Sequence, residues 1–365
     1  MDSKYGLIAM HQISGVGWHT IEKLYQIGWE PSRMPSEKMF HQLSKLNVSG
    51  QLITKIKKRW HAQFIQEVKK ELDTRNITAI TWLDEQYPPL LKEIAKPPWI
   101  LYAKGQLQLL NHLPTLAIVG TRKPTIYGEK VTMQICSELA KHDWTIISGM
   151  AMGIDGEVHR HVLEVGGKTI AVLATGVDVV YPKINRKLYT QLIQDGLVIS
   201  ESPPGTTAHA GLFPQRNRII SGLSQGTLVI EAAERSGSLI TADFSLEQGK
   251  DVFAIPGPIT SDKSAGTNQL IQQGAKCVTQ VDDILEEFSF VSERIVHQQQ
   301  KKQVELDSNE QLIMDLMSAH PISLAEITEK VGAHMDIQKI HQTLIFLEMK
   351  GEIIQLPGMQ YIFRM

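Results

Sequence analysis

The sequence predicts an α/β protein built on a doubly wound, mostly parallel sheet. Between residues 76 and 288, short apolar runs rich in β-branched residues alternate with helical stretches. Such runs are typical of parallel strands that helices cover on both faces. The six clearest runs are Leu116–Val119, Thr145–Ile147, Ile170–Leu173, Leu197–Ile199, Thr227–Ile230 and Val252–Ile255. Two additional strands are expected ahead of them, at 77–82 and 99–102.

Residues 1–75 are predicted to be helical, because apolar residues recur there at roughly helical spacing. Within this region, Ile13-Ser-Gly-Val-Gly17 resembles a helix-hairpin-helix, an element that binds phosphate backbones. Its two glycines permit a sharp turn that exposes amide hydrogens at the next helix start. An ordinary structural turn would use the same glycines. The region is most basic at Lys55-Ile-Lys-Lys-Arg59, where a solvated helix face is the alternative.

The C-terminal part of the chain is predicted to be a polar linker followed by a winged helix. Residues 289–306 are polar and include Gln298-Gln-Gln-Lys-Lys302. Three helices and a hairpin over residues 307–365 predict the winged helix. These elements are expected at 309–319, 323–331, 336–350, 352–355 and 360–363. Seven acidic and four basic residues over 309–365 give a net charge of −3, so we expect protein contact or modest duplex contact there rather than tight groove reading.

Bulk composition fits a soluble globular protein of two or three domains. The chain has 365 residues, of which 42% are hydrophobic and 21% are charged. The net charge is −2, so any contact with nucleic acid must come from local basic patches. Only two cysteines occur, which indicates a reducing compartment. The N-terminal residues do not resemble a signal peptide, and no apolar run reaches membrane-spanning length, so we expect a cytoplasmic protein without a membrane partner.

Two loops at the carboxyl ends of strands are suited to anions, and in doubly wound sheets ligands bind at these ends. In the first loop, Gly120 permits close approach of the backbone, Thr121 supplies a hydroxyl, and Arg122 and Lys123 supply positive charge before a helix. The second loop is Ser148-Gly-Met-Ala-Met-Gly-Ile-Asp155, in which Ser148, Gly149 and Gly153 are candidate phosphate-binding residues. Its glycine spacing differs from that of dinucleotide-binding folds, and Asp155 is expected to cap the following helix.

A third segment, Phe213-Pro-Gln-Arg-Asn-Arg218, combines an aromatic ring with two guanidinium groups and an amide. Arginines bind phosphate and an exposed ring can stack on a base, so Phe213, Arg216, Asn217 and Arg218 indicate nucleic-acid binding. The alternative is an arginine-rich helix start that surface carboxylates hold in place. One of the two arginines would then pair with a carboxylate such as Glu201 or Glu231.

Two motif matches are discounted, and no catalytic set is found. Gly167-Lys-Thr169 resembles the end of a P-loop, but Val162 stands where that motif requires its first glycine. His159 and His161 are two residues apart on a predicted helix, so they point to different faces and do not share a metal. We find no nucleophile–base pair and no paired carboxylates. The expectation is therefore a binding protein without catalytic residues, metal or cofactor.

Six motifs follow one another along the predicted sheet. They are Gly120-Thr-Arg122, Ser148-Gly-Met-Ala-Met-Gly-Ile-Asp155, Ser200-Glu-Ser-Pro-Pro-Gly205, Phe213-Pro-Gln-Arg-Asn-Arg218, Ser236-Gly-Ser-Leu-Ile-Thr241 and Gly266-Thr-Asn268. In order and spacing, these motifs resemble those of the DNA-processing protein DprA (Smf) family. The resemblance covers roughly residues 76–288, and the flanking segments fit longer members of the family. It implies an extended Rossmann-like core, preceded by a helical SAM-like domain and followed by a winged helix.

The resemblance implies a homodimeric protein that binds single-stranded DNA without strong sequence preference. It also implies loading of the RecA recombinase onto incoming strands during natural transformation in competent cells, with no enzymatic turnover. By the same resemblance, Arg122 and the Phe213–Arg218 segment would face the DNA backbone, and the Ser148–Asp155 loop would form the neighbouring phosphate pocket. Thr121 stands where many members have serine, and the hydroxyl is kept.

A second hypothesis is a nucleotide-acting Rossmann enzyme of the phosphoribohydrolase type. Such enzymes carry a Pro-Gly-Gly-x-Gly-Thr-x2-Glu signature. The comparable stretch here, Leu223–Glu231, lacks the glycine pair and places the glutamate one residue too far along. A purely scaffolding role with a vestigial pocket is a third alternative.

Overall fold

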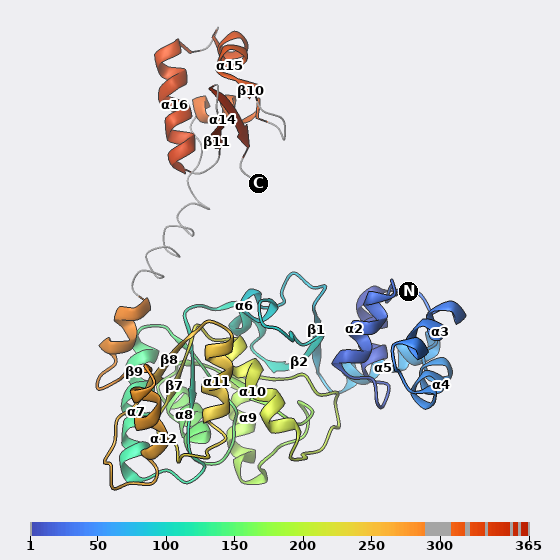
Figure 1. Cartoon of the computed structure of the whole chain (residues 1–365), viewed down its shortest axis with the longest axis vertical. Helices are drawn as coiled ribbons and strands as arrows, with labels where there is room; N and C mark the ends of the chain where they lie inside the picture. Colours follow the sequence, from blue (N-terminus) through green and yellow to red (C-terminus); the bar gives the residue numbers. More distant parts are fainter. Residues whose placement is uncertain are drawn as a thin grey trace. The chain divides into compact units, whose positions relative to one another are not determined.

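The computed structural model describes residues 2–288, 308–317, 322–332, 335–350, 353–356 and 359–363. The chain divides into two compact units, residues 1–286 and 287–365. The first unit holds the predicted helical region together with the sheet (Figure 1). The predicted linker over 289–306 lies outside the described residues.

A nine-stranded sheet forms the centre of the first unit, in the order β1-β2-β6-β5-β4-β3-β7-β8-β9. The strands from β6 to β9 pair in parallel, while β1 and β2 add an antiparallel edge. This topology confirms the predicted mostly parallel, Rossmann-like sheet. The strands are β1 (Thr78–Thr81), β2 (Ile100–Gly105), β3 (Thr115–Val119), β4 (Thr145–Ser148), β5 (Lys168–Leu173), β6 (Leu197–Ser200), β7 (Gly226–Val229), β8 (Asp251–Ala254) and β9 (Lys276–Cys277). All eight predicted strands are present, and β9 is an addition too short to leave a pattern in the sequence.

The helices that connect the strands pack on both faces of the sheet. Alternate residues along β2 and β5 belong to different hydrophobic clusters, because successive strand residues point to opposite faces. Helix α9 joins one cluster, and α10 and α11 join the other. The connecting helices are α6 (Pro89–Lys92), η1 (Leu107–Asn111), α7 (Ile126–Lys141), α8 (Ile154–Glu164), η2 (Lys183–Asn185), α9 (Arg186–Asp195), α10 (Leu212–Gly222), α11 (Leu239–Glu247) and α12 (Ala265–Gln272).

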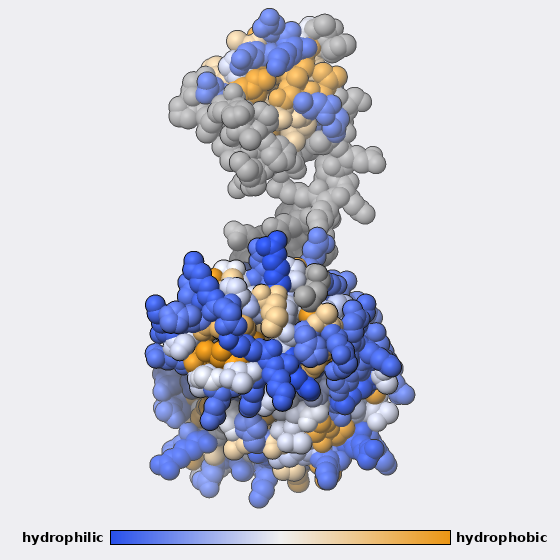
Figure 2. Space-filling model, turned by 90° about the vertical axis from the view of Figure 1, so that its right-hand side faces the viewer, coloured by the Kyte–Doolittle hydropathy of each residue, from blue (hydrophilic) through white to orange (hydrophobic). Residues whose placement is uncertain are grey.

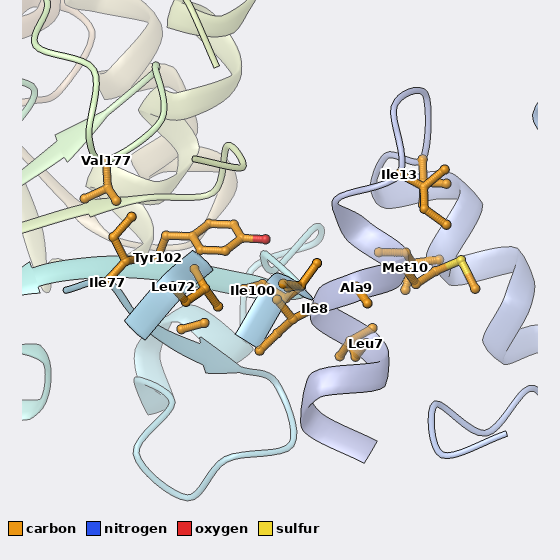
Figure 3. Close-up of a cluster of buried hydrophobic side chains, with 14 of the residues drawn as sticks. Leu7, Ile8, Ala9, Met10, Ile13, Leu72, Ile77, Ile100, Tyr102 and Val177 are labelled. Carbon is orange, nitrogen blue, oxygen red and sulfur yellow. The ribbon is translucent and has the colours of Figure 1, made fainter. Parts of the chain in front are cut away.

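The N-terminal helices share a core with the sheet. They are α1 (Ser3–His11), α2 (Trp18–Gln26), α3 (Glu37–Lys45), α4 (Gly50–Arg59) and α5 (Ala62–Thr74). The predicted boundary at residue 75 falls between α5 and β1, yet one hydrophobic cluster runs from Leu7 in α1 through Tyr102 in β2 to Val177 beyond β5 (Figure 3). The face turned to the viewer in Figure 2 is mainly hydrophilic over the first unit. Gly15, in the predicted hairpin between α1 and α2, has φ +98, and that turn packs on Leu52 of α4.

The second unit has the winged-helix arrangement that the sequence predicts. Helix α15 begins with a capping box, in which Ser323 and Glu326 each accept a hydrogen bond from the other's backbone amide. Helices α14 (Ser308–Met314), α15 (Leu324–Val331) and α16 (Ile337–Lys350) pack with strands β10 (Ile322–Ser323), β11 (Ile353–Leu356) and β12 (Gln360–Phe363). The three strands pair in the order β10-β12-β11. None of the helices described in the structure combines the length and apolar character that a membrane span requires.

Candidate nucleic-acid interface

An open cleft of about 690 Å³ lies at the carboxyl ends of the parallel strands. Its walls come from the loops after β3 and β4, from Tyr181 beyond β5, from α10, and from residues 236–241 at the start of α11. Strand β3 has β4 on one side and β7 on the other, so the strand order reverses there. Ligands of doubly wound sheets bind outside such a reversal. Six of the predicted site residues line this cleft or the smaller cavity beside it: Gly120, Arg122, Gly149, Phe213, Arg216 and Asn217.

The loop after β3 is clamped to the start of α8. Thr121 donates its amide hydrogen to the Glu231 carbonyl at 2.7 Å, and the Thr121 carbonyl accepts from the Ile154 amide at 3.1 Å. A Cβ atom at Gly120 would lie 2.7 Å from Cγ1 of Ile154. Gly153 has φ +74, and a Cβ atom there would collide with the Thr121 carbonyl oxygen. Glycines at these two positions therefore permit the close approach that fixes the cleft wall.

Arg216 is the most deeply placed of the predicted cations. Its side chain is buried, and Nη1 donates to the Gly149 carbonyl at 2.6 Å and to the Val172 carbonyl. A Cβ atom at Gly149 would collide with both terminal nitrogens of Arg216. Burial lowers the pKa of Arg216 to about 10, the nearby Asp155 carboxylate raises it, and the Arg122 guanidinium lowers it. Arg216 thus forms part of the cleft floor, held by backbone carbonyls, rather than reaching out into solvent.

Asp155 also lines the cleft, and it is not the cap of α8. The cap position belongs to Gly153, and Asp155 falls in the first helical turn. Its carboxylate accepts from the Ala151 amide at 3.4 Å, and burial raises the pKa of the carboxyl group while Arg216 lowers it. The prediction that Asp155 caps the helix was wrong, because the chain enters α8 two residues earlier. The carboxylate instead braces the loop that follows β4.

Arg122 and two aromatic rings form the outer part of the cleft. Arg122 is exposed, and its guanidinium carbon lies 5.7 Å from the centre of the Phe213 ring. The Phe213 ring is in turn 5.4 Å from the ring of Tyr181, at an interplanar angle of 50°. Cation–π and ring–ring contacts at these distances are attractive, so the three side chains support one another. The result is an aromatic surface with a cation beside it.

The remaining predicted site residues do not line the cleft. The Ser148 hydroxyl is buried and donates to the Ile118 carbonyl at 2.7 Å. Nη2 of Arg218 donates to both carboxylate oxygens of Glu201, which confirms the alternative that one of the two arginines pairs with Glu201. Lys123 is exposed on the loop after β3. Thr121 and Gly153, as described above, build the wall through their backbones.

Glu231 is engaged elsewhere and does not pair with either arginine. Its carboxylate accepts from the Thr125 amide at 2.9 Å and from the Thr125 hydroxyl at 2.5 Å. Thr125 is the cap residue of α7, so this contact fixes the start of that helix. The glutamate that the phosphoribohydrolase hypothesis considered is thus buried against Thr125.

Sequence reasoning missed Tyr181 and the cations that follow it. Tyr181 lines the cleft, and Lys183, Arg186 and Lys187 are exposed just beyond it. In the part of the chain that the structure describes, none of these three cations forms an ion pair. The sequence does contain a signal here: an aromatic residue and a proline after a strand, followed by three cations. This combination does not match a single known motif.

The arrangement is suited to binding phosphate and stacking a base. The buried guanidinium group of Arg216 and the exposed one of Arg122 carry hydrogen-bond donors suited to phosphate oxygens. The rings of Phe213 and Tyr181 provide flat apolar surface on which a base can stack. Among the described residues, no group of three or more histidine, cysteine, aspartate or glutamate side chains is placed to hold a metal ion. His159 is buried, and its Nδ1 lies 2.7 Å from the Thr169 hydroxyl oxygen.

Fold and site together define a Rossmann-like protein that has a cleft lined by arginines and aromatic rings, and a separate winged-helix unit. Comparison with protein families gives a narrower assignment. Residues 78–289 match the family described as DNA recombination-mediator protein A, and residues 297–359 match the DprA winged helix domain. The chain therefore belongs to the DNA recombination-mediator protein A (DprA, Smf) family.

Individual relatives agree with this assignment. Protein Smf from Synechocystis sp. is 34% identical over 333 residues, which cover 82% of each chain. The crystal structure of DprA from Streptococcus pneumoniae is similar with a TM-score of 0.68 and 36% identity, over 79% of this chain and 99% of that one. DNA processing protein A from Helicobacter pylori has a TM-score of 0.53 and 29% identity, over 58% and 95% of the two chains. The structure of that relative gives insight into a unique mode of single-stranded DNA binding.

Proposed function

We propose that this protein binds single-stranded DNA in the cleft at the carboxyl edge of its sheet and acts as a recombination mediator. The observation that carries the proposal is that Arg122, Arg216 and Phe213, taken from two separate segments of the sequence, line one cleft. Membership of the DNA recombination-mediator protein A family supports it, as does single-stranded DNA binding by the Helicobacter pylori relative.

The electrostatics of the cleft favour an anionic ligand. Arg122 lowers the pKa of Arg216, which means that the two positive charges repel each other. A phosphate between or beside them would relieve that repulsion and accept charge-assisted hydrogen bonds. Arg216 is already positioned by two carbonyl groups, so little side-chain entropy is lost when it binds.

The aromatic pair supplies a contact that does not depend on sequence. A base stacked on Phe213 or Tyr181 contributes about 1–3 kcal/mol, and every base has a flat face to offer. Beyond Tyr181, the exposed cations Lys183, Arg186 and Lys187 continue the positive surface along the start of α9. The strand is therefore proposed to pass from Arg122 over the rings toward α9.

The wider role is proposed from the family alone. It comprises a homodimer in the cytoplasm that loads the RecA recombinase onto incoming single strands during natural transformation. No enzymatic turnover, cofactor or metal is part of this proposal. The competing hypothesis, a nucleotide-acting enzyme, predicts release of a free base from a nucleoside monophosphate, which chromatography of the reaction mixture would detect.

The test of the proposal is a titration of a fluorescently labelled single strand at several salt concentrations. Wild-type protein should bind with an affinity that falls as salt rises and that changes little between unrelated sequences. Absence of binding at low salt would favour the scaffolding alternative.

A further inference from the structure

Two loops position the aromatic residues of the cleft. The Tyr181 loop, residues 174–182, follows β5 and contains Tyr181. The loop of residues 201–211, here called the Phe213 loop, follows β6 and leads into α10, where Phe213 is the second residue. Both contribute to the cleft: Ala174, Thr175 and Tyr181 come from the first, while Ala208 and His209 come from the second. The distance between the two rings therefore depends on how these loops are held together.

Asp178 joins the two loops at their outer ends. Its Oδ1 accepts from the Gly205 amide at 2.8 Å, and its Oδ2 accepts from Nη1 of Arg75 at 2.6 Å. Close by, the Gly176 amide donates to the Thr206 carbonyl at 2.9 Å. A Cβ atom at Gly176 would lie 2.7 Å from the Pro203 carbonyl oxygen, so the two loops are in direct contact here.

Arg75 brings the N-terminal helices into this contact. It is the C-cap residue that follows α5, and its backbone carbonyl accepts from Nζ of Lys104 in β2. Beside Asp178, the side chain of Val177 belongs to the hydrophobic cluster that runs through Tyr102 and Ile77 to α1, as Figure 3 shows. Two contacts thus anchor the Tyr181 loop. Val177 packs in the hydrophobic cluster that includes β2 and the N-terminal helices, and Asp178 forms an ion pair with Arg75.

The Asp178 carboxylate differs from an ordinary surface ion pair. Its side chain is only 18% exposed, whereas the Arg75 side chain is 41% exposed. Surface pairs contribute little because water and salt screen them. Asp178, however, uses both oxygens, one for a backbone amide and one for a guanidinium, and each contact fixes a different segment of chain.

We infer that Asp178 is a positioning residue for the proposed single-strand cleft: with Arg75, it holds the Tyr181 loop against the Phe213 loop, so that the two aromatic rings stay at stacking distance. The inference rests on the proposed function and extends it by assigning a role in the cleft to the N-terminal helices. Neither Asp178 nor Arg75 needs to touch the DNA.

The experiment compares Asp178→Asn and Arg75→Gln with wild type, using a single strand that carries one 2-aminopurine base. Each variant should bind about tenfold more weakly, the size expected for loss of one base stack. At saturating protein, the 2-aminopurine should be less quenched than with wild type, because the rings no longer stack on it. Arg75 also pairs with Glu71 at 2.7 Å, and Asp178 also accepts from the Gly205 amide, so each change affects one further contact. Because the two changes share the Asp178–Arg75 pair, the double variant should lose less affinity than the sum of the two single losses.

Lys141→Gln is the matched control, because it removes the same charge as Arg75→Gln and breaks a 2.6 Å ion pair, with Glu138, at the end of α7 and outside the cleft lining. The slope of affinity against salt should be the same for Arg75→Gln and Lys141→Gln. A shallower slope for Arg75→Gln alone would mean that Arg75 binds phosphate directly, which would overturn the positioning role. Wild-type affinity and quenching in Asp178→Asn would also overturn it. Failure of the wild type to bind would instead refute the proposed function.

Discussion

Nη1 of Arg216 donates a 2.6 Å hydrogen bond to the carbonyl of Gly149, so the arginine of one predicted motif is held by the glycine of another. The two residues are 67 positions apart in the sequence. Because a Cβ atom at Gly149 would occupy the space of the guanidinium group, only glycine permits this contact. The loop after β4 and the arginine segment therefore form one structure.

Gly149→Ala should displace Arg216 from the cleft floor. We expect a stability loss of about 1–3 kcal/mol from overpacking, together with weaker single-strand binding. Chemical denaturation and the strand titration measure the two effects. Gly50→Ala is a suitable control, since Gly50 lies at the start of α4 with no atom within 4 Å of the added Cβ. Unchanged binding in Gly149→Ala would mean that the position of Arg216 does not matter for the strand.

Arg218→Ala should affect stability rather than DNA binding. Its Nη2 lies 2.7 and 2.9 Å from the two oxygens of Glu201, and its side chain is 12% exposed. Loss of hydrogen bonds to a partly buried charge costs about 1.5–3 kcal/mol. The salt dependence of strand binding should stay as in wild type. A slope reduced to the same degree as in a cleft arginine variant would contradict the structural role assigned to this residue.

Lys250 gives the unfolding free energy a pH dependence with a defined sign. Its Nζ donates to the carbonyls of Ser221 and Gly222 at the end of α10, and burial lowers its pKa to about 8. Between this value and the ordinary value of 10.5, the unfolded state binds more protons than the folded state, so stability rises with pH. Wild type should therefore gain unfolding free energy relative to Lys250→Met as the pH rises from about 7.5 to 9.5. Denaturation at several pH values measures it, and a constant difference would contradict the lowered pKa.

Removal of residues 307–365 should leave most single-strand affinity intact. Helix α16, at the position that reads DNA in many winged helices, exposes the apolar side chains of Ile337, Ile345 and Phe346. Acidic residues outnumber basic ones by seven to four over 309–365, and this net charge of −3 disfavours tight phosphate contact. Strand titration of the shortened chain tests the expectation, and a loss of tenfold or more would contradict it.

Most of the fold could be predicted because parallel strands leave continuous apolar runs and because turns and helix starts follow from local chemistry. The sequence also placed Arg122 and Phe213 at the carboxyl edge of the sheet. It could not show that Arg216 is buried and Arg218 paired, because which side of α10 faces the sheet depends on tertiary packing. Tyr181 was missed for a similar reason: its role comes from contact with Phe213, 32 residues further along the chain.

The sequence also did not predict that the helical region and the sheet share one hydrophobic core. Apolar periodicity shows that a helix such as α1 buries one face, but not what covers that face. The partner of Leu7 and Ile8 turned out to be a cluster that includes β2 and the Tyr181 loop. Through this packing, the N-terminal helices share a hydrophobic cluster with the loop that carries Tyr181.

The most direct test of the central claim is the salt dependence of single-strand binding by Arg122→Ala. Arg122 is exposed at the cleft and lies over Phe213, so its removal should leave the fold intact. If it binds a phosphate, affinity should fall to a similar extent for unrelated sequences, and the slope of log affinity against log salt should become shallower by about 0.7. Wild-type affinity with a wild-type slope would contradict the assignment of this cleft as the strand-binding site.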